Sequence, residues 1–81
     1  MTYKIDGNLL QKGIREMVKL TVNNLESAIE KGSKSEIDAA VGFCYNAREV
    51  AILTLVNHSE IDFYLSEHSK ELRQRFGVEI K

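Results

Sequence analysis

The feature that most constrains this chain is the stretch at residues 49–56, the most apolar run in the sequence. Taken alone, this run fits a buried strand as well as a helix, because short apolar runs are ambiguous. Apolar residues upstream of it and within it recur at spacings of three and four, which is one face of a helix with 3.6 residues per turn. We therefore predict a helix over about 34–57, whose main apolar face consists of Ile37, Ala40, Val41, Cys44, Ala51, Ile52 and Leu55.

The same predicted helix carries a second apolar face, roughly 120–150° around its axis from the first. A helix that is apolar over so much of its circumference needs cover on several sides. A chain of 81 residues has little other structure to supply that cover, and oligomerisation is a natural way for a small domain to gain stability. We expect a second copy of the chain to pack here, in a homo-oligomer, against Ala39, Phe43, Ala47, Val50 and Thr54.

The flanking sequences complete a single all-α domain over residues 1–81. Asn8 and Gln11 have capping-box spacing, so a first helix is predicted over about 8–31, with Gly32 as its C-terminal cap. Ser33 and Glu36 open the second helix, and so short a connection predicts an antiparallel helical hairpin. A third helix is predicted over about 60–76; because residues 57–59 contain no Gly or Pro, a helix continuous through them is the alternative. The apolar stripe of the first predicted helix consists of Leu10, Ile14, Met17, Thr21, Leu25 and Ala28. That of the third predicted helix consists of Ile61, Leu65, His68, Leu72 and Phe76.

Composition excludes several classes of protein. Apolar residues make up 43% and charged residues 28%, which is ordinary for a folded domain, and the absence of proline fits continuous helix. The net charge of −1 gives no nucleic-acid footprint, so nucleic acid is not an expected partner. The start of the chain lacks the apolar core of a signal peptide, and no run approaches the ~20 residues that cross a bilayer. With a single Cys, a reducing cytoplasm is the expected location, with no membrane partner.

No pattern of catalytic residues stands out, and we expect a non-enzymatic protein without cofactor or metal. His58 and Asp62 have a spacing of four, but they stand alone and are read as an ion pair at a helix end. Cys44 falls on the main apolar face, which is typical of a small buried residue and not of a nucleophile. A helix-turn-helix would place its turn near Gly42, yet the apolar periodicity continues through that residue, which argues against sequence-specific DNA binding.

Arg48 is the anomaly, because it projects onto the main apolar face of the second helix. The stem of Arg48 can pack on this face while its head reaches water or pairs with a Glu. A charge that stays on such a face has to be paired, and its own helix offers no carboxylate at the right position. The partner must come from another helix, another subunit or an anionic ligand; Glu26 and Glu30 are the internal candidates, although both project away from the first helix's apolar stripe. A basic stripe on that helix is either solvated or attracts an anion, and consists of Lys12, Arg15 and Lys19.

Two segments carry a resemblance to a known family. Residues 9–17 (LLQKGIREM) and 44–53 (CYNAREVAIL) resemble the first and second helices of the phage anti-CBASS sponges, small homo-oligomeric proteins that sequester cyclic oligonucleotides. The resemblance covers about 8–56, and departs from the family at Arg48 and in the third helix. It implies that a cyclic di- or trinucleotide binds at a homo-oligomer interface in the host cytoplasm, inhibiting host antiviral signalling. An aromatic ring would stack on a base and basic side chains would bind phosphates, and the residues of these types are Tyr3, Lys12 and Arg48.

A shorter segment supports a different class of function. Residues 25–31 (LESAIEK) are similar to a helix-ending segment of the Hha-like modulators of nucleoid proteins. That resemblance implies a helical protein-binding regulator that acts on a host regulatory protein and has no nucleotide ligand.

Overall fold

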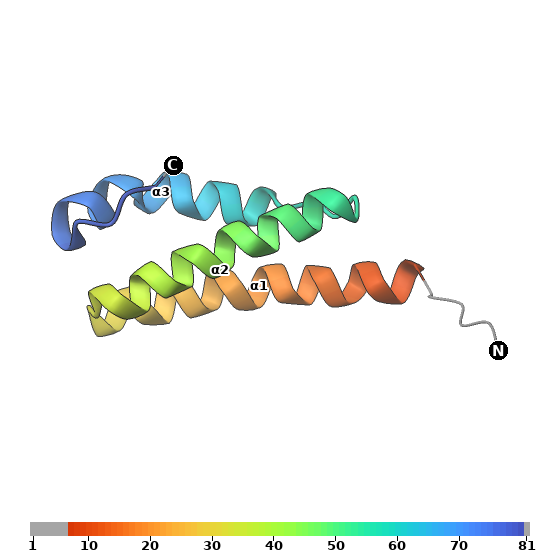
Figure 1. The fold of residues 1–81 in the computed structure, drawn as a ribbon, viewed down its shortest axis with the longest axis horizontal. Helices are drawn as coiled ribbons and strands as arrows, with labels where there is room; N and C mark the ends of the chain where they lie inside the picture. Colours follow the sequence, from red (N-terminus) through yellow and green to blue (C-terminus); the bar gives the residue numbers. More distant parts are fainter. Residues whose placement is uncertain (1–6, 81) are drawn as a thin grey trace.

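The computed structural model describes residues 7–80, which form three α-helices and no strand, as the apolar periodicity predicted. Helix α1 spans Gly7–Lys31, α2 spans Lys34–Leu53 and α3 spans Ser59–Phe76. Helices α1 and α2 lie side by side in opposite directions, and α3 packs along them in the same direction as α1 (Figure 1). The predicted hairpin with a third C-terminal helix is therefore confirmed for this part of the chain.

The hairpin connection follows the predicted capping residues. Gly32 adopts a left-handed φ of 70° and its N–H donates to the carbonyls of Ala28 (3.1 Å) and Ile29 (3.0 Å), which ends α1. The Ser33 hydroxyl then accepts from the backbone N–H of Glu36 at 3.4 Å and starts α2. Glycine at the turn and serine at the cap thus reverse the chain within two residues.

The other end of the hairpin differs from the sequence prediction. Helix α1 already begins at Gly7, so Asn8 lies inside its first turn and is not the residue that precedes the helix, as the prediction had it. The Gln11 side chain instead donates from Nε2 to the carbonyl of Thr54, 3.2 Å away, and joins the start of α1 to the end of α2. A contact of this kind depends on the neighbouring helix, so local sequence does not reveal it.

Helix α2 ends at Leu53, four residues before the predicted end. The N–H of Val56 donates to the carbonyl of Ala51 (2.8 Å), and that of Leu55 to the carbonyl of Ile52 (3.3 Å). This is the Schellman arrangement, in which the residue after the cap is left-handed, and here that residue is Leu55, with φ of 59°. The prediction of a helix to residue 57 was therefore wrong, and so was the alternative of one helix continuous through 57–59.

The core is made by one face of each helix together with the segment after α3. Leu10, Ile52 and Leu55 were predicted to face the core, but they are exposed, and all three lie at the end of the hairpin where α1 begins and α2 ends. Val78 is buried, since Gly77 turns the chain back onto the bundle at a φ of 66°. The buried residues are Ile14, Val18, Val22, Leu25, Ala28, Ile37, Ala40, Val41, Cys44, Ala47, Ala51, Val56, Ile61, Leu65, Leu72 and Val78.

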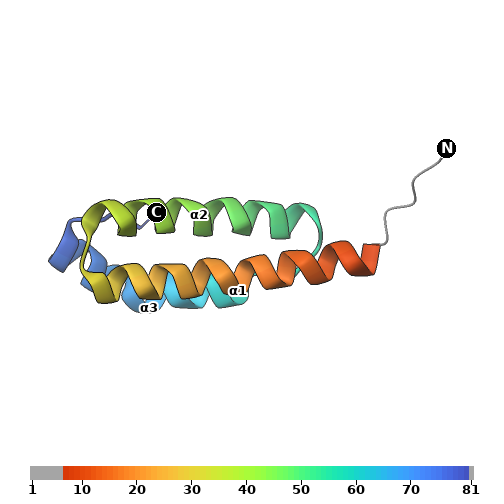
Figure 2. The same ribbon diagram turned by 90° about the horizontal axis from the view of Figure 1, so that it is seen from below.

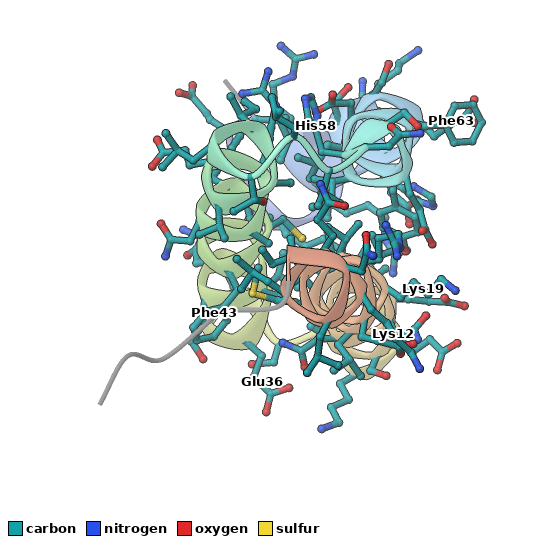
Figure 3. All side chains as sticks on the ribbon, turned by 90° about the vertical axis from the view of Figure 1, so that its right-hand side faces the viewer. Lys12, Lys19, Glu36, Phe43, His58 and Phe63 are labelled. Atoms are coloured by element: carbon teal, nitrogen blue, oxygen red, sulfur yellow. The ribbon has the colours of Figure 1, made fainter. Side chains whose placement is uncertain are left out.

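Helix α3 covers only one side of the hairpin. In Figure 2 it lies behind α1, and an end-on view shows the three helices at the corners of a triangle (Figures 2 and 3). Among residues 7–80, no element covers the side of α1 and α2 that faces away from α3. The large apolar side chains left exposed on the described chain are Leu9, Leu10, Leu20, Phe43, Val50, Ile52, Leu53, Leu55 and Phe63.

Candidate functional site

Arg48 pairs with a carboxylate of α3, and not with Glu26 or Glu30. Its Nε donates to Oδ1 of Asp62 at 2.8 Å, while Oδ2 of the same carboxylate lies 2.7 Å from Nδ1 of His58. The Arg48 and Asp62 side chains are each 43% exposed, so the pair sits at the edge of the buried face of α2 and not at its centre. The predicted pairing of His58 with Asp62 is confirmed, and it is part of a three-residue cluster joining α2 to α3.

A polar groove adjoins this cluster between α2 and α3. Among residues 7–80 the Arg48 guanidinium is bonded through Nε, which leaves its terminal nitrogens available to a ligand. The Asp62 carboxylate lines the same groove and opposes the entry of an anion. The groove has a volume of about 370 Å³ and is lined by Tyr45, Arg48, Asp62, Leu65, Ser66, Ser69 and Ile80.

Lys12 and Arg48, two of the three residues predicted to bind a nucleotide, are not brought together within the described chain. Lys12 is exposed on α1, on the side that carries Lys19 and faces away from α2 (Figure 3). It lines neither this polar groove nor the apolar groove described next. Arg48 lies between α2 and α3, and Tyr3 falls outside the described residues. The basic stripe predicted on the first helix is solvent-exposed throughout.

An apolar groove lies on the other side of the hairpin, between α1 and α2. Three of its side chains are exposed although they are large and apolar: Leu20 by 64%, Phe43 by 56% and Val50 by 38%. Figure 3 shows Phe43 on the side of α2 away from α3. The groove has a volume of about 440 Å³, and its lining contains no charged residue: Met17, Leu20, Thr21, Asn24, Phe43, Asn46, Ala47 and Val50.

The polar groups of this apolar groove are few. The Thr21 hydroxyl donates to the Val18 carbonyl at 2.8 Å, within its own helix. The amides of Asn24 and Asn46, by contrast, make no side-chain hydrogen bond within residues 7–80, and each offers both a donor and an acceptor. The second apolar face predicted for α2 located Phe43 and Val50. On α1 the predicted stripe contained Met17 and Thr21, but it missed Leu20 and Asn24, which lie beside it.

Cys44 and Tyr64 are two further reactive side chains, and both make contacts within the helical bundle. Burial raises the pKa of the Cys44 thiol, which donates to the Thr21 carbonyl at 3.6 Å and is therefore a poor nucleophile. Burial, followed by the nearby carboxylates of Glu26 and Glu71, raises the pKa of Tyr64, whose ring stacks on His68 with centroids 4.1 Å apart. Within the described chain, no group of three or more His, Cys, Asp or Glu side chains is placed to hold a metal ion.

The chain was compared with protein-family models, with curated proteins and with solved structures, and none of them matches it. Of the helices in residues 7–80, none combines the length and the apolar character that crossing a membrane requires. The grooves of the chain itself therefore carry the functional interpretation.

Proposed function

We propose that this chain is a non-enzymatic protein-binding module, in which the groove between α1 and α2 receives the apolar side of another helix. Recognition of an amphipathic helix in an apolar groove uses large side chains that would otherwise face water. One observation carries the proposal: a groove of about 440 Å³ lined entirely by uncharged residues, with Leu20, Phe43 and Val50 exposed around it. Depletion of charge is typical of the centre of a protein interface.

The dimensions of the groove fit this class of partner. It runs between two antiparallel helices, so a third helix laid along it would pack against ridges of side chains on both. The partner is expected to present apolar residues at spacings of three and four, and to place polar groups opposite Asn24 and Asn46. Leaving those amides unpaired in a closed interface would cost about 1–3 kcal/mol each, so they also select the partner.

Binding of a cyclic oligonucleotide is the second candidate, and the polar groove beside Arg48 supports it. That groove combines a guanidinium, the hydroxyls of Ser66 and Ser69 and the ring of Tyr45, which are the groups that phosphates and bases require. Two observations weigh against it within one chain: Asp62 occupies the same groove, and Lys12 lies elsewhere. If the chain sequesters a cyclic oligonucleotide, further basic groups are supplied by a second subunit at the interface.

One NMR titration with two probes distinguishes these functions. The ¹⁵N-labelled protein is titrated with a synthetic amphipathic helical peptide of about 18 residues, long enough to be helical, and separately with a cyclic dinucleotide and a cyclic trinucleotide. We expect the peptide to shift the amides around Leu20, Asn24 and Phe43, and the nucleotides to shift none. Nucleotide-dependent shifts around Arg48 and Ser66, with no response to the peptide, would replace the protein-binding function by the nucleotide-binding one.

A further inference from the structure

The apolar groove is part of two longer stripes that extend along both helices of the hairpin. On each helix, positions on the groove side recur at alternating spacings of three and four, the spacing of the contact positions in a coiled coil. All of these positions are exposed except Met17, and none is charged. We call these residues the hairpin face: Leu10, Gly13, Met17, Leu20, Asn24 and Ser27 of α1, and Ala39, Phe43, Asn46, Val50 and Leu53 of α2.

We propose that the partner of the hairpin face is a second copy of this chain, an inference that rests on the proposed protein-binding function and names its occupant. A two-fold interface brings the same surface of both copies together, so the surface must be complementary to itself. A patch that carries a single sign of charge fails this condition, because like charges then oppose one another across the interface. The hairpin face contains no charge, and therefore satisfies it.

The two asparagines support the same conclusion. An amide side chain carries both donors and an acceptor, so it can pair with an amide of an identical surface, whereas a carboxylate or an ammonium group cannot. Asn24 and Asn46 line the groove without a side-chain partner in residues 7–80. A single asparagine at a contact position also fixes the register of paired helices. The polar groups of the hairpin face are thus of the kind that a pair of identical copies can satisfy.

The amount of exposed apolar surface is sufficient for a dimer. Leu10, Leu20, Phe43, Val50 and Leu53 are exposed by 47%, 64%, 56%, 38% and 82%. Together these side chains expose roughly 600 Å², the same order as the ~800 Å² that each partner contributes to a stable interface. Two hairpins packed face to face form a four-helix bundle, in which helices cross at about 20°. Each copy of α3 then remains on the outside, where it covers the opposite side of its own hairpin.

The test compares two phenylalanines on opposite sides of the molecule. Phe43 lies on the hairpin face. Phe63 is 69% exposed on α3 and points away from the hairpin face (Figure 3). Sedimentation equilibrium over micromolar to hundreds of micromolar concentrations measures the dimer Kd of the wild type, Phe43→Asp and Phe63→Asp. We expect the wild type and Phe63→Asp to dimerise alike, and Phe43→Asp to raise the Kd by about 30-fold or more, as loss of a central interface residue does.

A second, milder pair of variants guards against misfolding. Asn46→Asp changes one atom and places a negative charge on the hairpin face, while Asn23→Asp places the same charge at an exposed position of α1 outside the groove. We expect Asn46→Asp to weaken dimerisation by about tenfold and Asn23→Asp to leave it unchanged, with the same circular dichroism for both. If Phe43→Asp and Phe63→Asp change the dimer Kd equally, or if Asn46→Asp and Asn23→Asp do, then the hairpin face is not the interface.

The outcomes separate this inference from the function on which it rests. A wild type that stays monomeric at hundreds of micromolar overturns the second copy as partner. If the groove of that monomer still responds to the helical peptide, the protein-binding function stands with another partner. If the groove does not respond, both proposals are overturned.

Discussion

Leu55 has a left-handed backbone, and this conformation determines whether alanine or glycine in its place gives the more stable protein. A side chain with a Cβ atom costs about 1–2 kcal/mol in this conformation, and glycine avoids that cost. Leu55 is 88% exposed, so truncating its side chain removes little packing, while the Schellman hydrogen bonds involve only its backbone. Stability is therefore governed by backbone conformation at this position, and not by burial.

The comparison that isolates this effect is Leu55→Ala against Leu55→Gly. Both variants lose the same leucine, and Gly differs from Ala by relief of about 1–2 kcal/mol of strain against an entropic cost of about 0.5–1 kcal/mol. We expect Leu55→Gly to be the more stable by about 0.5–1 kcal/mol, which corresponds to a rise in Tm of roughly 2–8 °C for a domain of this size. Thermal unfolding followed by circular dichroism measures it, at one protein concentration because self-association adds stability.

The matched control is the same pair at Glu67, an exposed residue within α3. In a helix interior the order reverses, and Glu67→Gly should be less stable than Glu67→Ala by about 1 kcal/mol. Opposite signs at the two positions are the expected result. If Gly is the less stable substitution at residue 55 as well, then Leu55 is not left-handed in solution and α2 does not end where the structure ends it.

The remaining predictions concern three side chains. Arg48→Met should lower the free energy of unfolding by less than about 1 kcal/mol in urea denaturation, because the Arg48–Asp62 pair is half exposed to water; a loss of several kcal/mol would mean that the pair is buried. Ser33→Ala should cost about 1 kcal/mol by the same measurement, because it removes the acceptor for the first turn of α2, and no change would show that the cap does not form. Burial raises the pKa of Cys44 in the folded state, so the thiol of the unfolded chain ionises at a lower pH than that of the folded chain. The protonated, buried thiol therefore contributes to the free energy of unfolding in full below about pH 8.5, and that contribution is lost as the pH rises above this value. Cys44→Ala should therefore show a smaller alkaline loss of stability than the wild type, and an equal loss would show that Cys44 does not contribute to it.

Arg48 shows why the candidate site was only partly predictable. Its position on α2 and its need for a counter-charge follow from the sequence, since both depend on helical periodicity and on the cost of an unpaired charge. The choice of Asp62 over Glu26 and Glu30 depends on where α3 crosses α2, which no local pattern encodes. Phe43 and Val50 were likewise predicted to form a second apolar face, but the groove also needed the α1 side chains opposite them.

The sequence by itself determined the three helices, the hairpin and most of the core. Periodicity identified the buried residues Ile37, Ala40, Val41 and Cys44, while Gly32 and Ser33 marked where the first helix ends and the second begins. These features depend on contacts between residues a few positions apart, which a local pattern records. Only the tertiary structure decided that α2 stops at Leu53, that Arg48 meets Asp62, and that one side of the hairpin is left uncovered. The last two depend on the side of the hairpin against which α3 packs, and that is decided by the burial of apolar surface across the whole chain.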